Sequence, residues 1–333
     1  MSNQEVFIVS AARTPLGSFQ GSLSALSAID LGATSIRSAL ERAGVPGDKV
    51  DEVYMGNVLS AGVGQAPARQ AAIAAGIDKQ APAMTVSKVC GSGLQSAILA
   101  TRSLRLGDSG VVVAGGMESM SNAPYLLPKA RGGFRMGHGE VLDSMICDGL
   151  WDPYGDFHMG NAAEDCASKY ELSRQAQDDF ARASYKRALA AQEKGGFKDE
   201  LVPVTIKGRR GETVVDTDEE PGRAKLDKMG ALRPAFLSDG TITAANASKI
   251  NDGASALVLA SGDAVKAHGL KPIARVVSYA GHAQEPRWFT TAPVGATRRA
   301  LASAGLEAGD VDLYEINEAF SVVTMACARD LGV

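Results

Sequence analysis

The sequence has 333 residues, of which 45% are hydrophobic and 22% are charged, a composition typical of a globular protein long enough for two core-bearing units. Its formal net charge of −4 argues against a nucleic-acid partner, which usually requires a basic face. No apolar run approaches the roughly 20 residues that span a bilayer, so we expect no membrane partner. The four cysteines show neither metal-ligand spacing nor disulfide density, which favours a reducing compartment, most simply the cytoplasm.

The first part of the chain predicts an alternation of strands and helices. Continuous apolar runs, typical of strands buried on both faces, occur at residues 6–9, 53–55, 83–86 and 111–114. Apolar residues at helical spacing predict helices over residues 29–43 and 66–75 and a third from residue 94 onward. Gly44 suits the C-cap of the first helix, and Pro67 suits the first turn of the second. This βαβα alternation predicts a layered α/β fold.

The pattern changes between residues 118 and 250. Residues 121–160 are rich in Gly, Pro, Met and Asp and have weak periodicity, and a long irregular stretch of this kind is usually functional. One helix is predicted at 174–194, and a buried strand resumes at 255–259. We therefore expect residues 1–117 and 251–271 to form one α/β half and residues 118–250 to form an inserted loop domain.

A second half is predicted over residues 272–333. Residues 39–44 and 50–51 have counterparts at 300–305 and 311–312, at the same spacing, which indicates an internal repeat. In this half we expect a strand at 311–316 and a helix at 319–331. The counterpart of Cys90 would fall beyond residue 333, so we expect the second half to be incomplete, with the chain truncated at its C-terminus.

Cys90 lies between the strand at 83–86 and the helix that follows, at a strand-to-helix turn. Unpaired N–H groups and the helix dipole would stabilise a thiolate there, which predicts a lowered pKa. Gly91 and Gly93 would leave room around the sulfur and let amides point at an oxyanion. This arrangement is a cysteine analogue of the nucleophile elbow. The alternative is a buried core cysteine, which is common for this residue type.

Further motifs occur in order along the chain, at residues 12–17 (ARTPLG), 64–70 (GQAPARQ), 115–121 (GGMESMS), 158–160 (HMG), 246–248 (NAS) and 317–320 (NEAF). Together with the Cys90 turn, this ordered set resembles the thiolase family. The resemblance implies a layered α/β/α fold of two similar halves with an inserted loop domain. The family's C-terminal Gly-His-Pro and Cys-x-Gly motifs, which carry acid/base residues, have no counterpart in residues 272–333. Their absence predicts impaired activity.

Within the family the chain is most similar to the biosynthetic acetyl-CoA C-acetyltransferases. The resemblance implies condensation of two acetyl-CoA to acetoacetyl-CoA and coenzyme A, and the reverse thiolysis, through an acetyl-Cys90 intermediate. No cofactor would be required, coenzyme A being substrate and product. Residues 133–137 resemble the loop through which thiolase dimers pair, which implies a homodimer or homotetramer. The alternatives are a degradative 3-ketoacyl-CoA thiolase and a non-catalytic acyl-CoA-binding fragment.

The resemblance also implies roles for individual residues. Asn317, at the carboxyl end of the predicted strand, would position a water in an oxyanion hole. His158 and Met159 would line the acyl pocket and keep it short, whereas spacing alone leaves His158 open as a base for Cys90. Substrate and coenzyme A contacts would come from Leu150, His158, Met159, Arg223, Lys228, Phe236, Ala245, Ser248, Ala319 and Phe320. A potassium ion, as found in some relatives, would lie at Tyr185, Ala244, Ala245 and Ala247.

Overall fold

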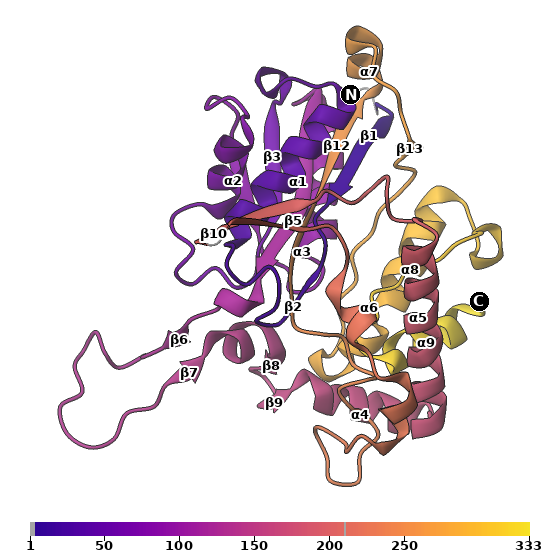
Figure 1. The fold of residues 1–333 in the computed structure, drawn as a ribbon. Helices are drawn as coiled ribbons and strands as arrows, with labels where there is room; N and C mark the ends of the chain where they lie inside the picture. Colours follow the sequence, from indigo (N-terminus) through magenta and orange to yellow (C-terminus); the bar gives the residue numbers. More distant parts are fainter. Residues whose placement is uncertain (1–3, 210) are drawn as a thin grey trace. The chain divides into compact units, whose positions relative to one another are not determined.

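The computed structural model describes residues 4–209 and 211–333 and groups the chain into two compact units (Figure 1). Unit 1 comprises Met1–Gly149, Gly195–Glu220 and Ile250–Val276, and unit 2 comprises Leu150–Lys194, Pro221–Lys249 and Val277–Val333. Each unit is therefore assembled from three separate segments of the chain. The predicted division into two halves and an inserted loop domain is not tested by this grouping and stays a prediction.

A mixed seven-stranded sheet forms the centre of unit 1, in the order β13-β1-β12-β5-β3-β4, with β2 paired to β12. β3 pairs in parallel with both β4 and β5, and the other pairings are antiparallel. The strands are β1 (Val6–Arg13), β2 (Gly17–Ser18), β3 (Glu52–Gly56), β4 (Ala83–Val86), β5 (Val111–Ser119), β12 (Asn251–Ser261) and β13 (Ala274–Arg275). The five strands predicted from apolar runs before residue 260 are confirmed.

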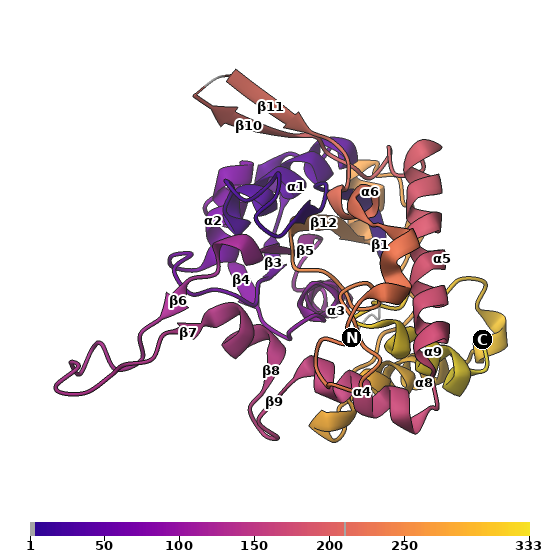
Figure 2. The ribbon, with the colours of Figure 1, turned by 60° about the horizontal axis from the view of Figure 1, so that its bottom comes forward.

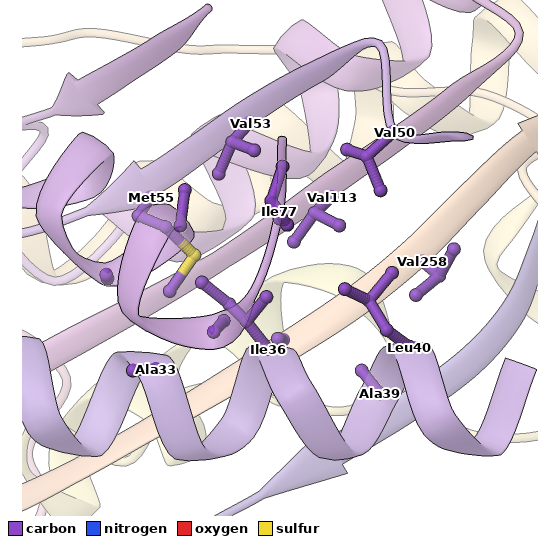
Figure 3. Close-up of a cluster of buried hydrophobic side chains, with 14 of the residues drawn as sticks. Ala33, Ile36, Ala39, Leu40, Val50, Val53, Met55, Ile77, Val113 and Val258 are labelled. Carbon is purple, nitrogen blue, oxygen red and sulfur yellow. The ribbon is translucent and has the colours of Figure 1, made fainter. Parts of the chain in front are cut away.

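Helices cover both faces of this sheet. Side chains alternate between the faces of a strand, so Val111 and Val113 of β5 join one cluster while Val112 and Ala114 join another. The first cluster includes α1 (Ala28–Ala43) and α2 (Pro67–Ala75), and the second includes α3 (Ser92–Leu106). Figure 3 shows α1 side chains pointing at the sheet from Ala33, Ile36, Ala39 and Leu40. Unit 1 thus has three layers, α/β/α, as expected.

The internal repeat has a local structural counterpart. α1 ends at Gly44, whose φ of 65° is left-handed, and α8 (Ala292–Ala304) ends at Gly305 with a φ of 69°. A short 3₁₀ turn follows each helix, η1 (Gly47–Lys49) and η6 (Ala308–Asp310). Glycine reaches this backbone conformation without the steric cost that a Cβ imposes, so both helices end in the same way.

Unit 2 is built mainly from helices. These are α4 (Met159–Lys169), α5 (Arg174–Glu193), α8 and α9 (Ser321–Leu331), with a core that includes Ala163, Cys166, Ile242, Phe320, Val322, Val323, Ala326 and Cys327. α5 and α9 confirm the helices predicted at 174–194 and 319–331. α4 was missed, although Ala162, Ala163, Cys166 and Ala167 repeat at helical spacing.

The strand predicted at 311–316 is wrong. After η6 the chain runs irregularly through these residues, and Leu313 is 83% exposed. A strand needs a neighbouring strand to pair its backbone N–H and C=O groups, and no described residues provide one beside this segment. The predicted second α/β arrangement is therefore not found in the described part of 272–333, where β13 pairs with β1 of unit 1.

The remaining elements are short. They are β6 (Tyr125–Leu126), β7 (Leu142–Asp143), β8 (Trp151–Asp152), β9 (Phe157–His158), β10 (Val204–Gly208), β11 (Gly211–Val215), η2 (Met120–Asn122), η3 (Met145–Leu150), α6 (Glu219–Arg223), η4 (Leu226–Ala231), α7 (Gly262–His268) and η5 (Pro286–Thr291). β6 and β7 form the base of an arm that projects from unit 1 (Figures 1 and 2). Among the described residues, no helix is long and apolar enough to cross a membrane.

Arg13 at the end of β1 anchors the chain segment that returns at 195–220. Its guanidinium donates bidentate hydrogen bonds to the Asp218 carboxylate, at 2.7 and 2.9 Å, and a third hydrogen bond to Glu200 at 2.5 Å. It also lies 5.1 Å from the ring centroid of Phe197. Burial opposes the charged form, but the hydrogen bonds and charges of Asp218 and Glu200 raise the pKa of Arg13 above its ordinary value. This cluster therefore binds distant parts of unit 1 together.

We expect Arg13→Met to lower the free energy of unfolding by about 3 kcal/mol, because it leaves the Asp218 carboxylate buried without its charged partner. Urea unfolding of the intact chain measures this change. The matched control is Arg275→Met, whose ion pair with Glu5 has side chains 53% and 62% exposed. An exposed pair of that kind contributes about 0–1 kcal/mol. Equal losses in the two variants would contradict the assignment of Arg13 as an anchor.

Candidate active site

Cys90 lies on the surface of unit 1, in the turn between β4 and α3. The residue before it, Val89, has a φ of 46°. This region is sparsely populated, and for a β-branched side chain it is a true outlier that costs about 1–3 kcal/mol. Strain of this kind concentrates at functional sites, where surrounding contacts maintain it. The predicted strand-to-helix turn is confirmed, and the alternative of a buried core cysteine is wrong.

Ser92, the first residue of α3, holds this turn closed. Its hydroxyl accepts a hydrogen bond from the Lys88 N–H at 2.8 Å and donates one to the Val89 carbonyl at 2.6 Å. The backbone adds a bond from the Ser92 N–H to the same Val89 carbonyl at 3.0 Å. Ser92 is buried, so these bonds compete little with water. The sequence places Ser92 between Gly91 and Gly93 in the predicted Cys90 turn, but its role in closing the turn was not predicted.

At this turn, the start of α3 lies closest to Gly56, at the end of β3. A Cβ added to Gly56 would lie 2.8 Å from the Gly93 nitrogen and from the Ser92 Cβ. A Cβ on Gly91 or Gly93 would find no atom nearer than 3.4 Å or 3.7 Å, respectively. The first turn of α3 therefore packs directly against the backbone of β3. This packing leaves no room for a side chain at residue 56, which must be glycine.

Glu118 on β5 carries a half-buried carboxylate near the same turn. It accepts hydrogen bonds from the Val58 N–H at 2.9 Å, the Leu59 N–H at 3.1 Å and the Asn57 side-chain amide at 2.8 Å. Burial raises the pKa of Glu118, although the two backbone hydrogen bonds act in the opposite direction. Sequence reasoning placed Glu118 in a motif but gave it no role.

The expected lowering of the Cys90 pKa is not found. Desolvation by the surrounding turn raises the pKa of the Cys90 thiol, and the charge of Glu118 raises it further. Only the hydrogen bond from the backbone of Cys90 itself lowers it. The helix-start effect is outweighed because α3 begins at Ser92, beyond the sulfur-bearing residue, while a carboxylate lies close by. At rest the thiol is therefore favoured over the thiolate.

All four cysteines are free. Cys166 and Cys327 are buried, and burial raises the pKa of both thiols, that of Cys327 to about 11. Cys147 is exposed, and its hydrogen bond to the Asp148 carboxylate raises its pKa. Exposure at a strained turn beside a helix start therefore sets Cys90 apart from the other three.

In unit 2, the 246–248 and 317–320 motifs lie side by side. The Ser248 N–H donates to the Ala319 carbonyl at 2.9 Å, and the Ser321 N–H donates to the Asn246 carbonyl at 2.8 Å. Ala247 and Phe320 form an isolated antiparallel bridge between them. The structure thus brings together several predicted site residues, namely Ala245, Ala247, Ser248, Asn317, Ala319 and Phe320. The roles predicted for them stay predictions.

Aromatic rings extend this cluster toward His158. The His158 ring stacks on Phe236 with centroids 4.8 Å apart and an interplanar angle of 27°, and Phe236 meets Phe320 edge to face at 6.3 Å. Met159 packs against the same core. A Cβ on Gly160 would lie 2.3 Å from the Phe236 ring, so this glycine lets the ring lie over the start of α4.

His158 caps α4 with its own side chain. Its Nδ1 accepts the Gly160 N–H at 3.0 Å, which requires a lone pair on Nδ1 and places the proton of the neutral ring on Nε2. Burial lowers the pKa of His158, so the ring is neutral near pH 7. The free ring nitrogen is therefore a hydrogen-bond donor. This geometry favours a substrate-lining role over that of a base.

A polar network holds the 241–248 loop that carries these residues. The buried Glu164 carboxylate accepts the N–H groups of Thr241 at 2.9 Å and Ile242 at 2.8 Å. The Asn246 amide donates to Asp178 of α5 at 3.0 Å, and Asp178 pairs with Arg174 at 2.8 Å. Sequence reasoning gave no role to Glu164 or Asp178, because their partners in this loop lie more than 60 residues away along the chain.

The remaining residues predicted to contact the substrate are Leu150, Arg223 and Lys228. Leu150 ends η3 and is partly buried, whereas Arg223 on α6 and Lys228 on η4 are exposed. Ala244 is connected to Tyr185 of α5 through a lysine that was not predicted, Lys249. No group of three or more His, Cys, Asp or Glu residues in the described part of the chain could hold a metal ion.

Comparison with known proteins gives two family matches. The family model described as "Thiolase, N-terminal domain" matches residues 6–263, and "Thiolase, C-terminal domain" matches residues 270–333. Acetyl-CoA acetyltransferase of Pseudomonas aeruginosa is 51% identical over 331 residues, which cover 99% of this chain and 84% of that protein. Acetyl-CoA acetyltransferase 2 of Arabidopsis thaliana is 52% identical over 333 residues, 99% of this chain and 83% of the relative.

A third relative, acetyl-CoA acetyltransferase of Schizosaccharomyces pombe, is 51% identical over 335 residues, which cover 100% of this chain and 85% of that protein. The predicted family is confirmed by these matches. They do not show that the chain is truncated, that its second half is incomplete or that its activity is impaired.

We expect Ser92→Ala to open the turn locally. The Lys88 N–H loses its acceptor, so its hydrogen exchange should accelerate by about tenfold, the effect of one net hydrogen bond. Exchange measured by NMR or mass spectrometry reports this change. Ser96→Ala is the matched control, because the Ser96 hydroxyl donates to the Ser92 carbonyl at 3.0 Å and does not touch Lys88. Unchanged exchange at Lys88 in the Ser92 variant would refute this role of Ser92.

We also expect Glu118→Gln to lower the pKa of Cys90, because it removes a charge that disfavours the thiolate while retaining one of the two side-chain oxygens as an acceptor. Alkylation by iodoacetamide requires the thiolate, so its rate at Cys90 should rise at lower pH than in the parent chain. Peptide mass mapping across a pH series measures this shift. Glu193→Gln, at the exposed end of α5, is the control. Coincident pH profiles for the two variants would contradict the proposed coupling.

Proposed function

This chain belongs to the thiolase family and is an acyltransferase, and from that premise we propose that it is an acetyl-CoA C-acetyltransferase. It condenses two acetyl-CoA molecules to acetoacetyl-CoA and coenzyme A, and catalyses the reverse thiolysis. The observation that carries the proposal is an exposed Cys90 at a strained turn beside the start of α3. Relatives 50–52% identical that are named acetyl-CoA acetyltransferase support the choice of acetyl group.

The proposed reaction has two stages. The Cys90 sulfur attacks the thioester carbonyl of the first acetyl-CoA, coenzyme A leaves as its thiol, and an acetyl thioester remains on Cys90. A second acetyl-CoA then loses a Cα proton, which ends on the released Cys90 sulfur, and the resulting enolate attacks that thioester. Acetoacetyl-CoA leaves, and the Cys90 sulfur is regenerated. The raised pKa of Cys90 means that the first stage requires proton transfer from a neutral thiol.

The proposed substrate contacts are supported by the paired segments 246–248 and 317–320 of unit 2 and by the rings of His158 and Phe236 beside them. His158 and Met159 would limit the acyl pocket, since the His158 ring is fixed by its Gly160 contact and by stacking on Phe236. Asn317 would hold a water for an oxyanion, next to the paired segments at 246–248 and 317–320. The remaining proposed contacts to the acyl group, pantetheine arm and phosphates are Leu150, Arg223, Lys228, Phe236, Ala245, Ser248, Ala319 and Phe320.

We further infer that the protein assembles as a homodimer or homotetramer in the cytoplasm. The β6–β7 arm carries exposed apolar side chains, including Phe134 at 46% and Met136 at 98% exposed. Apolar side chains on a projecting arm favour burial against another copy of the chain. Four free cysteines fit a reducing compartment.

The proposed function is tested by thiolysis of acetoacetyl-CoA by the chain as it exists, with mass spectrometry of the acylated peptide. Cys90→Ser should lower kcat by about 10³-fold or more, because the nucleophile is lost. Cys147→Ser is the matched control, since Cys147 is also exposed and should be dispensable. The acetyl group should appear on Cys90.

Four results would each overturn part of this proposal. Full turnover by the Cys90 variant, or acetylation of a different residue, would remove Cys90 as the nucleophile. A 3-ketoacyl-CoA series separates the acyl groups, because a preference for longer chains would replace the acetyl assignment with that of a degradative thiolase. Binding of acyl-CoA without any turnover would instead indicate a non-catalytic acyl-CoA-binding protein.

A further inference from the structure

A lysine side chain, which carries a positive charge, already lies among the four residues that resemble a potassium site. Lys249 ends the loop that carries Ala244, Ala245 and Ala247, and its ammonium donates a hydrogen bond to the Ala244 main-chain carbonyl. The same ammonium lies 5.8 Å from the ring centroid of Tyr185 on α5. Two of the four residues implied for potassium therefore contact a lysine side chain.

A carbonyl oxygen and the face of an aromatic ring are both groups that attract a cation. The oxygen accepts a hydrogen bond from an ammonium or coordinates a metal ion, and the ring interacts through its negative face within about 6 Å. A lysine ammonium and a potassium ion both carry one positive charge. A second cation on the Ala244 carbonyl would meet repulsion from the Lys249 charge. The residues present therefore do not fit a bound potassium ion.

We propose that the Lys249 ammonium is a built-in cation that takes the place of potassium, so that this protein needs no potassium at this site. The proposal rests on the acetyltransferase function for its kinetic readout only. Its structural readout is independent of any activity.

The contact also explains how the loop is held. Three side-chain contacts join the loop to α5. The Gln177 amide donates to the Thr241 hydroxyl at 2.9 Å, the Asn246 amide donates to Asp178 at 3.0 Å, and Lys249 lies over the Tyr185 ring. Ala245 and Ser248, which are proposed to contact the pantetheine arm, lie within this tethered loop. Next to Tyr185, the Ser184 hydroxyl donates to Glu318 at 2.8 Å and so ties the 317–320 segment to the same helix. Lys249 is thus a positioning residue for the substrate-contacting loop.

The experiment compares KCl, NaCl and choline chloride at equal ionic strength, so that general charge screening is constant. For the unmodified protein, the thermal unfolding midpoint and the KM for coenzyme A in acetoacetyl-CoA thiolysis should be the same in all three salts. Lys249→Met keeps the apolar stem and removes the charge. In choline chloride it should lower the midpoint by about 2 °C and raise KM about three- to fivefold, with kcat changed less.

Potassium should restore both quantities in Lys249→Met, because the carbonyl and ring become available to a free cation. Lys249→Arg retains a charge and should remain independent of potassium. The matched control is Lys266→Met, an exposed lysine on α7 of unit 1, which should change neither quantity in any salt.

Three outcomes would overturn the proposal. One is stabilisation or a lower KM of the unmodified protein in potassium relative to choline. Another is a Lys249→Met variant that matches Lys266→Met in every salt, which would make Lys249 an ordinary surface lysine. The third is a destabilised Lys249→Met that potassium does not restore, which would mean that this place is not a cation site. A chain without thiolase activity would refute the proposed function, while the unfolding midpoints would still decide the role of Lys249.

Discussion

The insertion of β12 between β1 and β5 is the constraint on which the rest of unit 1 depends. β12 begins more than 130 residues after β5 ends, yet it pairs antiparallel with β5 from Asp252 opposite Ser119 to Ala260 opposite Val111. The chain must therefore leave the sheet, build the loops and helices of 120–250, and return in register. Asp252 fixes the entry point, because its buried carboxylate accepts the Ser121 N–H at 2.9 Å.

The returning segments are held by charge as well as by strand pairing. Arg13 leaves the end of β1 and binds Glu200 and Asp218, which precede β12 along the chain. Glu219 then accepts hydrogen bonds from the N–H groups of Ser18 and Ser22 at 2.9 and 3.0 Å. The buried Asp218 carboxylate stabilises one path of the chain, because a displaced path would leave it without its charged partner.

The same sheet decides the chemistry at Cys90. β3, β4 and β5 run parallel, so their carboxyl ends meet at one edge, where α/β folds place ligands. Asn57 follows β3, Cys90 follows β4 and Glu118 lies near the end of β5. Three separate strands thereby place a thiol, an amide and a half-buried carboxylate close together. The turn is strained at Val89 and closed by Ser92, so the position of Cys90 follows from packing and hydrogen bonding together.

Local pattern in the sequence determined much of this protein. Apolar runs and helical spacing located five of the seven strands of the sheet and helices α1, α2, α3, α5 and α9, because these patterns follow from side-chain direction within a single element. Gly44, Pro67 and the turn at Cys90 were equally readable, because caps and turns depend on neighbouring residues. Ordered motifs along the chain were enough to indicate the family.

Only the tertiary structure decided properties that depend on distant groups. The pKa of Cys90 is raised because the turn is desolvated and Glu118 comes from another strand. The tautomer of His158 follows from its Gly160 contact, and its lowered pKa follows from burial. Residues 311–316 have the composition of a strand but no strand beside them among the described residues, and Lys249 meets Tyr185 from a different element. Electric fields, desolvation and strand pairing act through space, so the local order of residues does not record them.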